Sequence, residues 1–121
     1  MHQLRLQIEH VGGLQEIRLA GAVEPSNFPA LASTLRRSID AGKPAIILDC
    51  REVTHFGSAE LKELHDLVMH ARALGGDIRC VGLLPQIRQV VSLIAGSDAL
   101  HCHDDLLDAI AAFHNGATVA V

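Results

Sequence analysis

The chain has 121 residues, of which 49% are apolar and only 2% aromatic, and its formal net charge is −4. This length suits one domain with a single core, and the apolar fraction excludes a disordered chain. Scarce aromatic side chains and a negative charge argue against a nucleic-acid-binding surface, which needs stacking groups and a basic face.

The N-terminal segment and the cysteines bear on the cellular compartment. Residues 1–10 alternate in polarity and lack the apolar stretch of a signal peptide. No apolar run approaches the roughly 20 residues that span a bilayer. Cys50, Cys80 and Cys102 are widely spaced without a Cys-x-x-Cys pair, so we interpret them as small hydrophobic residues. We therefore expect a cytoplasmic protein that does not insert into a membrane.

The first third of the chain predicts two strands and a helix. Alternation of apolar and polar residues over 4–9 is typical of a half-buried strand. A glycine pair, Gly12-Gly13, then predicts a turn into a second strand at about Gln15–Ala20. A loop from Gly21 to Phe28 is expected to end in an N-cap residue, Ser26 or Asn27. The helix that follows has an apolar stripe at i, i+4 and i+8, formed by Leu31, Leu35 and Ile39.

A buried strand and a helix opened by a serine form the central stretch, from Ile46 to Gly76. The continuous apolar run Ala45–Leu48 predicts a strand covered on both faces, which ends at Asp49 or Cys50. Ser58 is a natural N-cap for the helix, because its hydroxyl can accept an unpaired backbone N–H.

The helix after Ser58 is predicted to be amphipathic. Its buried stripe is expected to include Leu61, Leu64 and Leu74, with Glu60 among the residues on the solvent side. The pair Gly75-Gly76 is a strong signal for the end of the helix.

The last third predicts two more strand–helix units. A strand at Asp77–Gly82 leads to a helix that Pro85 opens and Gly96 stops. A short strand at Ala99–His103 precedes a helix capped by Asp104, and residues 115–121 are expected to fray. The inward positions of this last helix are Leu106, Leu107, Ile110 and Phe113.

The element order β-β-α-β-α-β-α-β-α has no internal repeat or linker. Strands that alternate with helices predict a mixed sheet with right-handed crossovers. We therefore expect a single α/β domain, with four to five strands, about four helices and an ordered core over about residues 3–114.

The segment LDCREVTHFGSAELKELHDLVMHARALGG resembles the central signature of the STAS domain, the fold of bacterial anti-sigma factor antagonists. The later segments DIRCVGLLPQIRQVVSLIAGSDAL and DDLLDAIAAF are similar to the strand, helix and final helix that follow in the family. The entry segment IRLAGAVEPSNFPALASTL is also similar, so the resemblance covers nearly the whole chain. It implies a non-enzymatic bacterial signalling domain in transcription regulation, which switches between protein partners. The expected partner is an anti-sigma factor that resembles a serine kinase, with a phosphatase as a second partner. The resemblance also allows the chain to form a homodimer.

The family signature contains Asp-Ser-(Ser/Thr/Ala)-Gly-Leu, in which the first Ser or Thr is phosphorylated. The resemblance therefore assigns the phosphoacceptor to Ser58, although an N-cap role alone would also explain this serine. Gly57 replaces the Asp of the signature and Glu60 replaces its Gly, which moves the negative charge to the other side of Ser58. A phosphate on Ser58 would meet Glu60 as a like charge, so a member that binds partners without a switch is the alternative. The candidate partner-binding residues are His55, Phe56, Gly57, Ala59, Glu60, Lys62, Glu24, Ser26 and Asn27.

Two other functions stay open from the sequence. One is a STAS subunit of a lipid or anion transport assembly, which would bind without a switch. The other is a small hydrolase or metal enzyme, which is disfavoured because Phe-Gly-Ser-Ala-Glu lacks the second glycine of a nucleophile elbow. His101 and His103 could place two imidazoles on one face of a strand, but no third metal ligand is visible. We therefore favour a solvated strand edge over a metal site for these two histidines, and we expect no cofactor.

Overall fold

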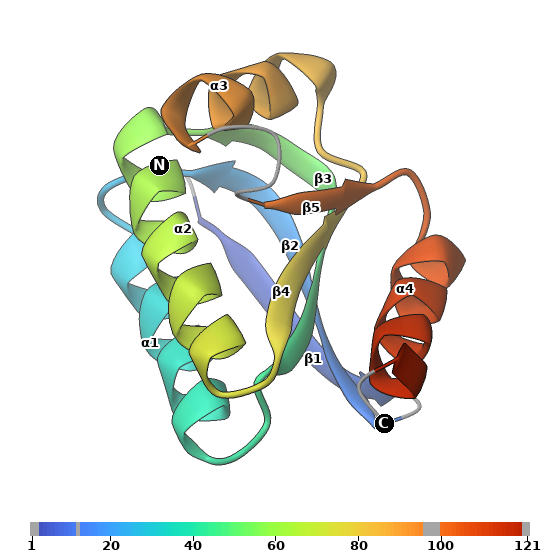
Figure 1. Ribbon diagram of the computed structural model, residues 1–121. Coiled ribbons are helices and arrows are strands. Elements are labelled where there is room, and N and C mark those ends of the chain that lie inside the picture. The colour runs from blue at the N-terminus through green and yellow to red at the C-terminus, as the bar shows by residue number, and fades with distance from the viewer. Residues whose placement is uncertain (1–2, 12, 96–99, 120–121) are drawn as a thin grey trace.

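The computed structural model describes residues 3–11, 13–95 and 100–119 (Figure 1). Within these ranges the elements follow the predicted order, which confirms the single α/β domain. Their bounds are β1 (Arg5–Val11), β2 (Leu14–Val23), α1 (Phe28–Asp40), β3 (Ala45–Phe56), α2 (Ser58–Ala73), β4 (Asp77–Val81), α3 (Pro85–Ala95), β5 (His101–His103) and α4 (Leu106–Val119).

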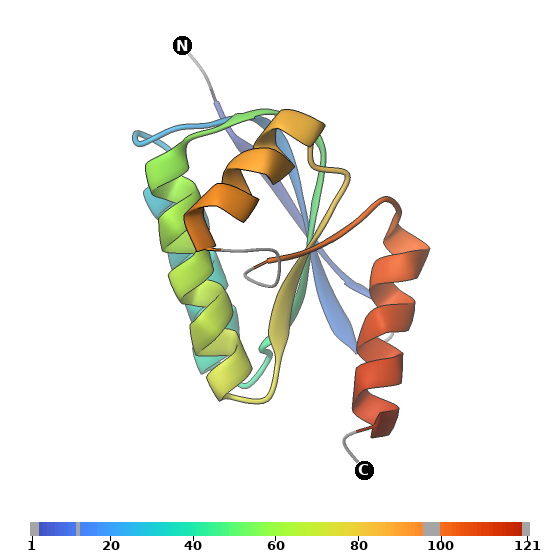
Figure 2. The ribbon, with the colours of Figure 1, turned by 45° about the horizontal axis from the view of Figure 1, so that its top comes forward.

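The five described strands form one mixed sheet in the order β1-β2-β3-β4-β5. The β1–β2 hairpin is antiparallel, and the other neighbouring strands pair in parallel. Helices connect the parallel strands because a parallel pair requires a crossover. Helices α1, α2 and α3 cover one face of the sheet, and α4 packs on the opposite face (Figure 2).

The core has a large layer under α1, α2 and α3 and a smaller layer under α4. Strand β3 contributes to both layers, with Ile46 and Leu48 in the larger one and Ile47 in the smaller one. This two-sided burial confirms the interpretation of the continuous apolar run at residues 45–48. All three cysteines are free thiols, and Cys50 and Cys80 are buried as expected.

Strand β3 continues to Phe56, so the predicted end at Asp49 or Cys50 is wrong. Backbone pairing with β2, which itself reaches Val23 rather than ending near Ala20, extends the strand through a polar stretch. Two register shifts occur in this pairing. The ladder of backbone hydrogen bonds therefore sets the strand length where hydrophobicity gives no signal.

The end of α2 confirms the role of the glycine pair. The Gly76 N–H donates to the Ala71 carbonyl at 2.9 Å, and the Gly75 N–H donates to the Arg72 carbonyl at 3.1 Å. Gly75 has a φ of +87°, which completes a Schellman motif. Leu74 is the C-cap residue and is 54% exposed, so its predicted place in the buried stripe is wrong.

The start of α4 differs from the prediction by one residue. Asp105, rather than Asp104, accepts the backbone N–H of Asp108 at 2.9 Å and so occupies the N-cap. Leu107 consequently faces solvent and Ala109 is fully buried, which corrects the predicted inward face. The helix also runs to Val119, into the expected tail.

Three sequence predictions fall on residues outside the described ranges. They are the Gly12 half of the first turn, the helix stop at Gly96 and the start of the last strand at Ala99.

A buried carboxylate lies on the sheet face that α4 leaves partly open. Asp49 is 1% exposed and accepts two hydrogen bonds from the Arg51 guanidinium, at 2.9 and 2.6 Å. Arg18 lies 3.5 Å from the same carboxylate. Burial alone would raise the pKa of Asp49, but the side-chain and backbone hydrogen bonds from Arg51 outweigh it and hold the pKa below the ordinary 3.8.

We predict that Arg51→Met lowers the free energy of unfolding at pH 7 by about 1 kcal/mol, because Arg51 is half-exposed. When folding lowers the pKa of a carboxyl, the ionised group stabilises the fold at pH values above its pKa in the unfolded chain. This stabilisation is lost as the pH falls through the pKa of the folded state. The variant should therefore lose less stability than the wild type between about pH 5 and pH 2. Urea unfolding across this range measures the difference. The control is Arg36→Met, at an exposed position on α1. If the free energy of unfolding fell with pH equally in the wild type and in Arg51→Met, Arg51 would not be the cause of the lowered pKa of Asp49.

Candidate functional site

The ends of β2 and β3 bring two connections together. The parallel pairing continues to Val23 opposite Phe56, and the Gly57 N–H then donates to the Val23 carbonyl at 3.3 Å. The loop after β2 and the start of α2 therefore lie at the same end of the sheet (Figure 2). In sheets of this type, the carboxyl ends of parallel strands are the usual place for binding sites.

Asn27 holds the loop between β2 and α1. Its amide oxygen accepts the Glu24 N–H at 2.9 Å, and its amide nitrogen donates to the Ala22 carbonyl at 2.9 Å. Asn27 is the N-cap residue by position, as one of the two predicted candidates, but its side chain makes no capping bond to α1. Ser26 is exposed and Glu24 is half-buried. The asparagine thus fixes the shape of the loop and leaves Ser26 at the surface.

An aromatic pair anchors both connections to the core. The rings of Phe28 and Phe56 are 6.3 Å apart between centroids, and both side chains are buried. Phe56 was expected on the partner surface, but its side chain belongs to the core because it ends β3 on the side covered by the helices. The pair limits relative movement of the two connections.

Ser58 is exposed and is the first residue of α2, so its predicted N-cap role is wrong. Gly57 occupies the N-cap, with φ −62° and ψ 148°. Within the described ranges, the Ser58 hydroxyl makes no hydrogen bond to another protein group. The capping explanation for this serine therefore fails, and its hydroxyl is accessible for chemistry.

Glu60 is 5% exposed, although the sequence placed it on the solvent side of α2. Its carboxylate lies over Gly57, where a Cβ added to residue 57 would overlap it. The backbone angles of Gly57 suit any residue, so a side chain at position 57 would be opposed only by the Glu60 carboxylate, which would have to move aside. A carboxylate in the first turn is favoured by the helix dipole. The two departures from the family signature thus form one structural unit.

The exposed candidates gather around this unit. His55 near the end of β3 is exposed, as are Ser58, Ala59 and Lys62 in the first turns of α2. Ser26 is exposed in the loop after β2. Together, residues 24–27 and 55–62 define what we call the loop surface. Thr54 is exposed beside it and was missed, because the predicted strand ended too early.

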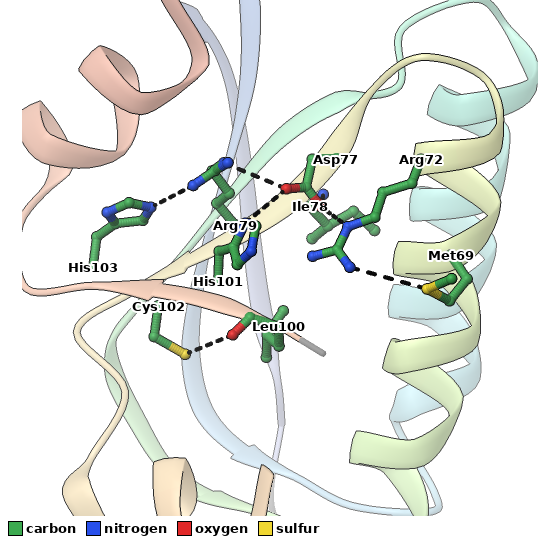
Figure 3. A network of polar contacts seen from close by, with 9 residues as sticks. All are labelled: Met69, Arg72, Asp77, Ile78, Arg79, Leu100, His101, Cys102 and His103. Carbon is green, nitrogen blue, oxygen red and sulfur yellow. Dashed lines mark hydrogen bonds and ion pairs between the residues drawn. The ribbon is translucent and has the colours of Figure 1, made fainter. Parts of the chain in front are cut away.

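The histidines of β5 lie in a separate polar network (Figure 3). His101 Nδ1 is 3.2 Å from Asp77 Oδ2, at ion-pair distance but not aligned for a hydrogen bond. Arg79 Nη1 donates to His103 Nε2 at 3.1 Å. Burial, and then the Arg79 charge, lower the pKa of His103 from its ordinary 6.5. In the part of the chain that the structure describes, no three His, Cys, Asp or Glu side chains are arranged to hold a metal ion.

We predict that the effect of Gly57→Ala on stability depends on Glu60. In a Glu60→Ala background the methyl group finds free space, and the loss of unfolded-state entropy should stabilise the fold by about 0.4–1 kcal/mol. In the wild-type background the methyl group displaces the buried carboxylate, so the gain should vanish or change sign. A double-mutant cycle by urea unfolding measures this coupling. Equal effects of Gly57→Ala in both backgrounds would contradict the contact.

A family model described as "Mlab, STAS domain" matches residues 6–101. A relative named "Putative anti-sigma factor antagonist BtrV", from Bordetella bronchiseptica, is 23% identical over 90 residues, which cover 74% of this chain and 78% of the relative.

Solved structures share the fold at low sequence identity. An anti-sigma factor antagonist from Mycobacterium paratuberculosis superposes with a TM-score of 0.81 at 21% identity, over 93% of this chain and 95% of that chain. The phosphorylated form of the Bacillus cell fate determinant SpoIIAA gives 0.71 at 17% identity, over 89% and 98%. The murine Slc26a9 anion transporter gives 0.71 at 16% identity, over 88% of this chain but 18% of that chain.

Among the described helices, none has both the length and the apolar character that crossing a bilayer demands. The sheet order, the helix layers and the family match agree, and this chain belongs to the STAS domain family.

Proposed function

We propose that this protein is a non-enzymatic regulator of the anti-sigma factor antagonist class, which acts in the bacterial cytoplasm by binding a protein partner. The binding site is the loop surface. The observation that carries the proposal is the exposed Ser58 hydroxyl at the first position of α2, in a member of the STAS family. The relative from Bordetella bronchiseptica, which is named as such an antagonist, supports the same class.

The loop surface has the character of a preformed docking site. Its two connections are joined by the Gly57–Val23 hydrogen bond and anchored by the Phe28–Phe56 pair. Exposed loop residues held on a rigid scaffold are a common arrangement for binding, because little conformational entropy is lost on association. The partner we propose is an anti-sigma factor with a serine-kinase-like fold, which would phosphorylate Ser58. A phosphatase would remove this phosphate.

Phosphorylation of Ser58 is the proposed switch. A phosphate adds a charge of about −1.5 to −2 at pH 7. The N-terminus of α2 tolerates an anion, but the Glu60 carboxylate already lies over Gly57. The second negative charge would therefore be repelled, which would change the loop surface and release the partner.

A second candidate function is a binding subunit of a lipid or anion transport assembly. The family model is described by the name Mlab, and the same fold occurs within the murine Slc26a9 anion transporter. In this case the loop surface would bind the partner without a switch, and the buried Glu60 would provide a permanent charge beside Ser58.

We predict that Ser58→Asp reduces recovery of the partner by at least about tenfold in affinity capture from the native host, a loss of about 1.4 kcal/mol of binding free energy. The reason is a second carboxylate beside Glu60. The control is Ser33→Asp, which adds the same charge at an exposed position on α1. Partner identity by mass spectrometry separates an anti-sigma factor from a transporter subunit.

Equal recovery with Ser58→Asp and wild type would rule out the switch and favour the transport role. A matching loss with Ser33→Asp would mean that general charge, rather than the loop surface, controls capture. With the captured kinase, Ser58→Ala should abolish phosphate labelling, and unchanged labelling would overturn the phosphoacceptor assignment.

A further inference from the structure

A cavity of about 410 Å³ lies at the β5 edge of the sheet. Residues of β4, β5 and α3 form it, and none of its described lining residues belongs to the loop surface. Its polar lining consists of Arg79, Arg88, Ser92, His101, Cys102 and His103. The volume is in the usual range of small-molecule sites, about 300–1,000 Å³.

The described lining is basic although the chain carries a net charge of −4. Four of these residues are Arg or His, and none is Asp or Glu. Arg79 shares the nearby Asp77 carboxylate with Arg72, at Nε–oxygen distances of 3.4 and 2.9 Å. Arg88 pairs at 3.2 Å with Asp104, whose side chain is 88% exposed. Exposed ion pairs of this kind contribute little to stability, so a ligand could take over Arg88 at little cost.

We propose that this cavity binds a small soluble anion that carries a phosphate group, such as a phosphate monoester or pyrophosphate. Arg79 and Arg88 line the cavity and supply the positive charge, and the Ser92 hydroxyl and an imidazole N–H add neutral donors. Several donors on three elements suit the three terminal oxygens of a phosphate better than the two of a carboxylate. The site is independent of the proposed partner switch.

The hydrogen bond at His103 supports this assignment. A guanidinium can only donate, so His103 Nε2 must accept from Arg79, and the neutral imidazole carries its proton on Nδ1. The Nδ1–H is thus left as a donor. An anion in the cavity would offset the arginine charges and make protonation of His103 easier.

Several other charged groups act on the same imidazole and enter any titration. Arg79, Arg88, His101 and Asp108 act on it directly. Asp77 and Asp104 pair with three of these groups, and Arg72 pairs with Asp77.

The test uses the full-length protein with sodium pyrophosphate, against sodium chloride at matched ionic strength. The pKa of His103, followed by NMR of the imidazole, should rise in pyrophosphate and stay unchanged in chloride. Arg88→Gln should weaken pyrophosphate binding by about tenfold or more, since it removes a charge-assisted contact. Arg36→Gln on α1, a surface arginine outside the cavity, should bind as the wild type does. The proposal would be overturned if the pKa of His103 rose equally in both salts, or if Arg88→Gln and Arg36→Gln lost the same affinity for pyrophosphate.

Cys102 gives a second readout, because it is the partly exposed cysteine and lines the cavity, whereas Cys50 and Cys80 are buried. Pyrophosphate should slow its alkylation by neutral iodoacetamide, and an unchanged rate would overturn the proposal. Vesicles of phosphatidylcholine with phosphatidylglycerol form the last arm. We expect no binding to them, and vesicle binding without a response to pyrophosphate would contradict a site for a soluble ligand. Ser58→Asp should leave pyrophosphate affinity unchanged, which separates this site from the proposed partner switch.

Discussion

The parallel pairing of β2 with β3 is the constraint on which the candidate site depends. The ladder continues past the polar residues Arg51 and Glu52 of β3 to Val23 opposite Phe56, both of which are buried in the core. This extension places the loop that Asn27 shapes next to the first turn of α2. The Phe28–Phe56 pair then joins both segments to the core. If the strands separated earlier, Ser58 would still be exposed, but no fixed neighbouring loop would complete a surface for a partner.

The pair Gly57 and Glu60 distinguishes this chain from the signature it resembles. The carboxylate lies in the space that a side chain at residue 57 would occupy, so a larger residue there would have to displace it. The negative charge beside Ser58 is therefore supplied from the helix instead of from the loop. The helix dipole stabilises this charge, and a phosphate on Ser58 would compete with it for the same N-terminus. In the proposed switch, this arrangement would leave the loop surface available to a partner and would change the electrostatic response to a phosphate on Ser58.

The order of elements, the aliphatic stripes of α1 and α2 and the glycine end of α2 could be predicted, because each depends on local periodicity or on a backbone requirement of glycine. The end of β3 could not, since pairing with a distant strand extends it through Arg51 and Glu52. Burial of Glu60 could not be predicted from the sequence, because a charged residue normally faces solvent and the space that its carboxylate occupies over Gly57 is visible only in the structure. The cavity at β5 joins residues of α3, β4 and β5, so no local pattern indicates it.

The central claim is that residues 24–27 and 55–62 form the surface that binds a protein partner. Hydrogen–deuterium exchange of the full-length protein, free and bound to the partner captured from its native host, tests this most directly. The account predicts slower exchange on binding at the backbone amides of these two segments, and little change in β1 and α4. Protection confined to β5, or to the open sheet face around Arg18 and Arg51, would place the partner elsewhere and contradict the claim.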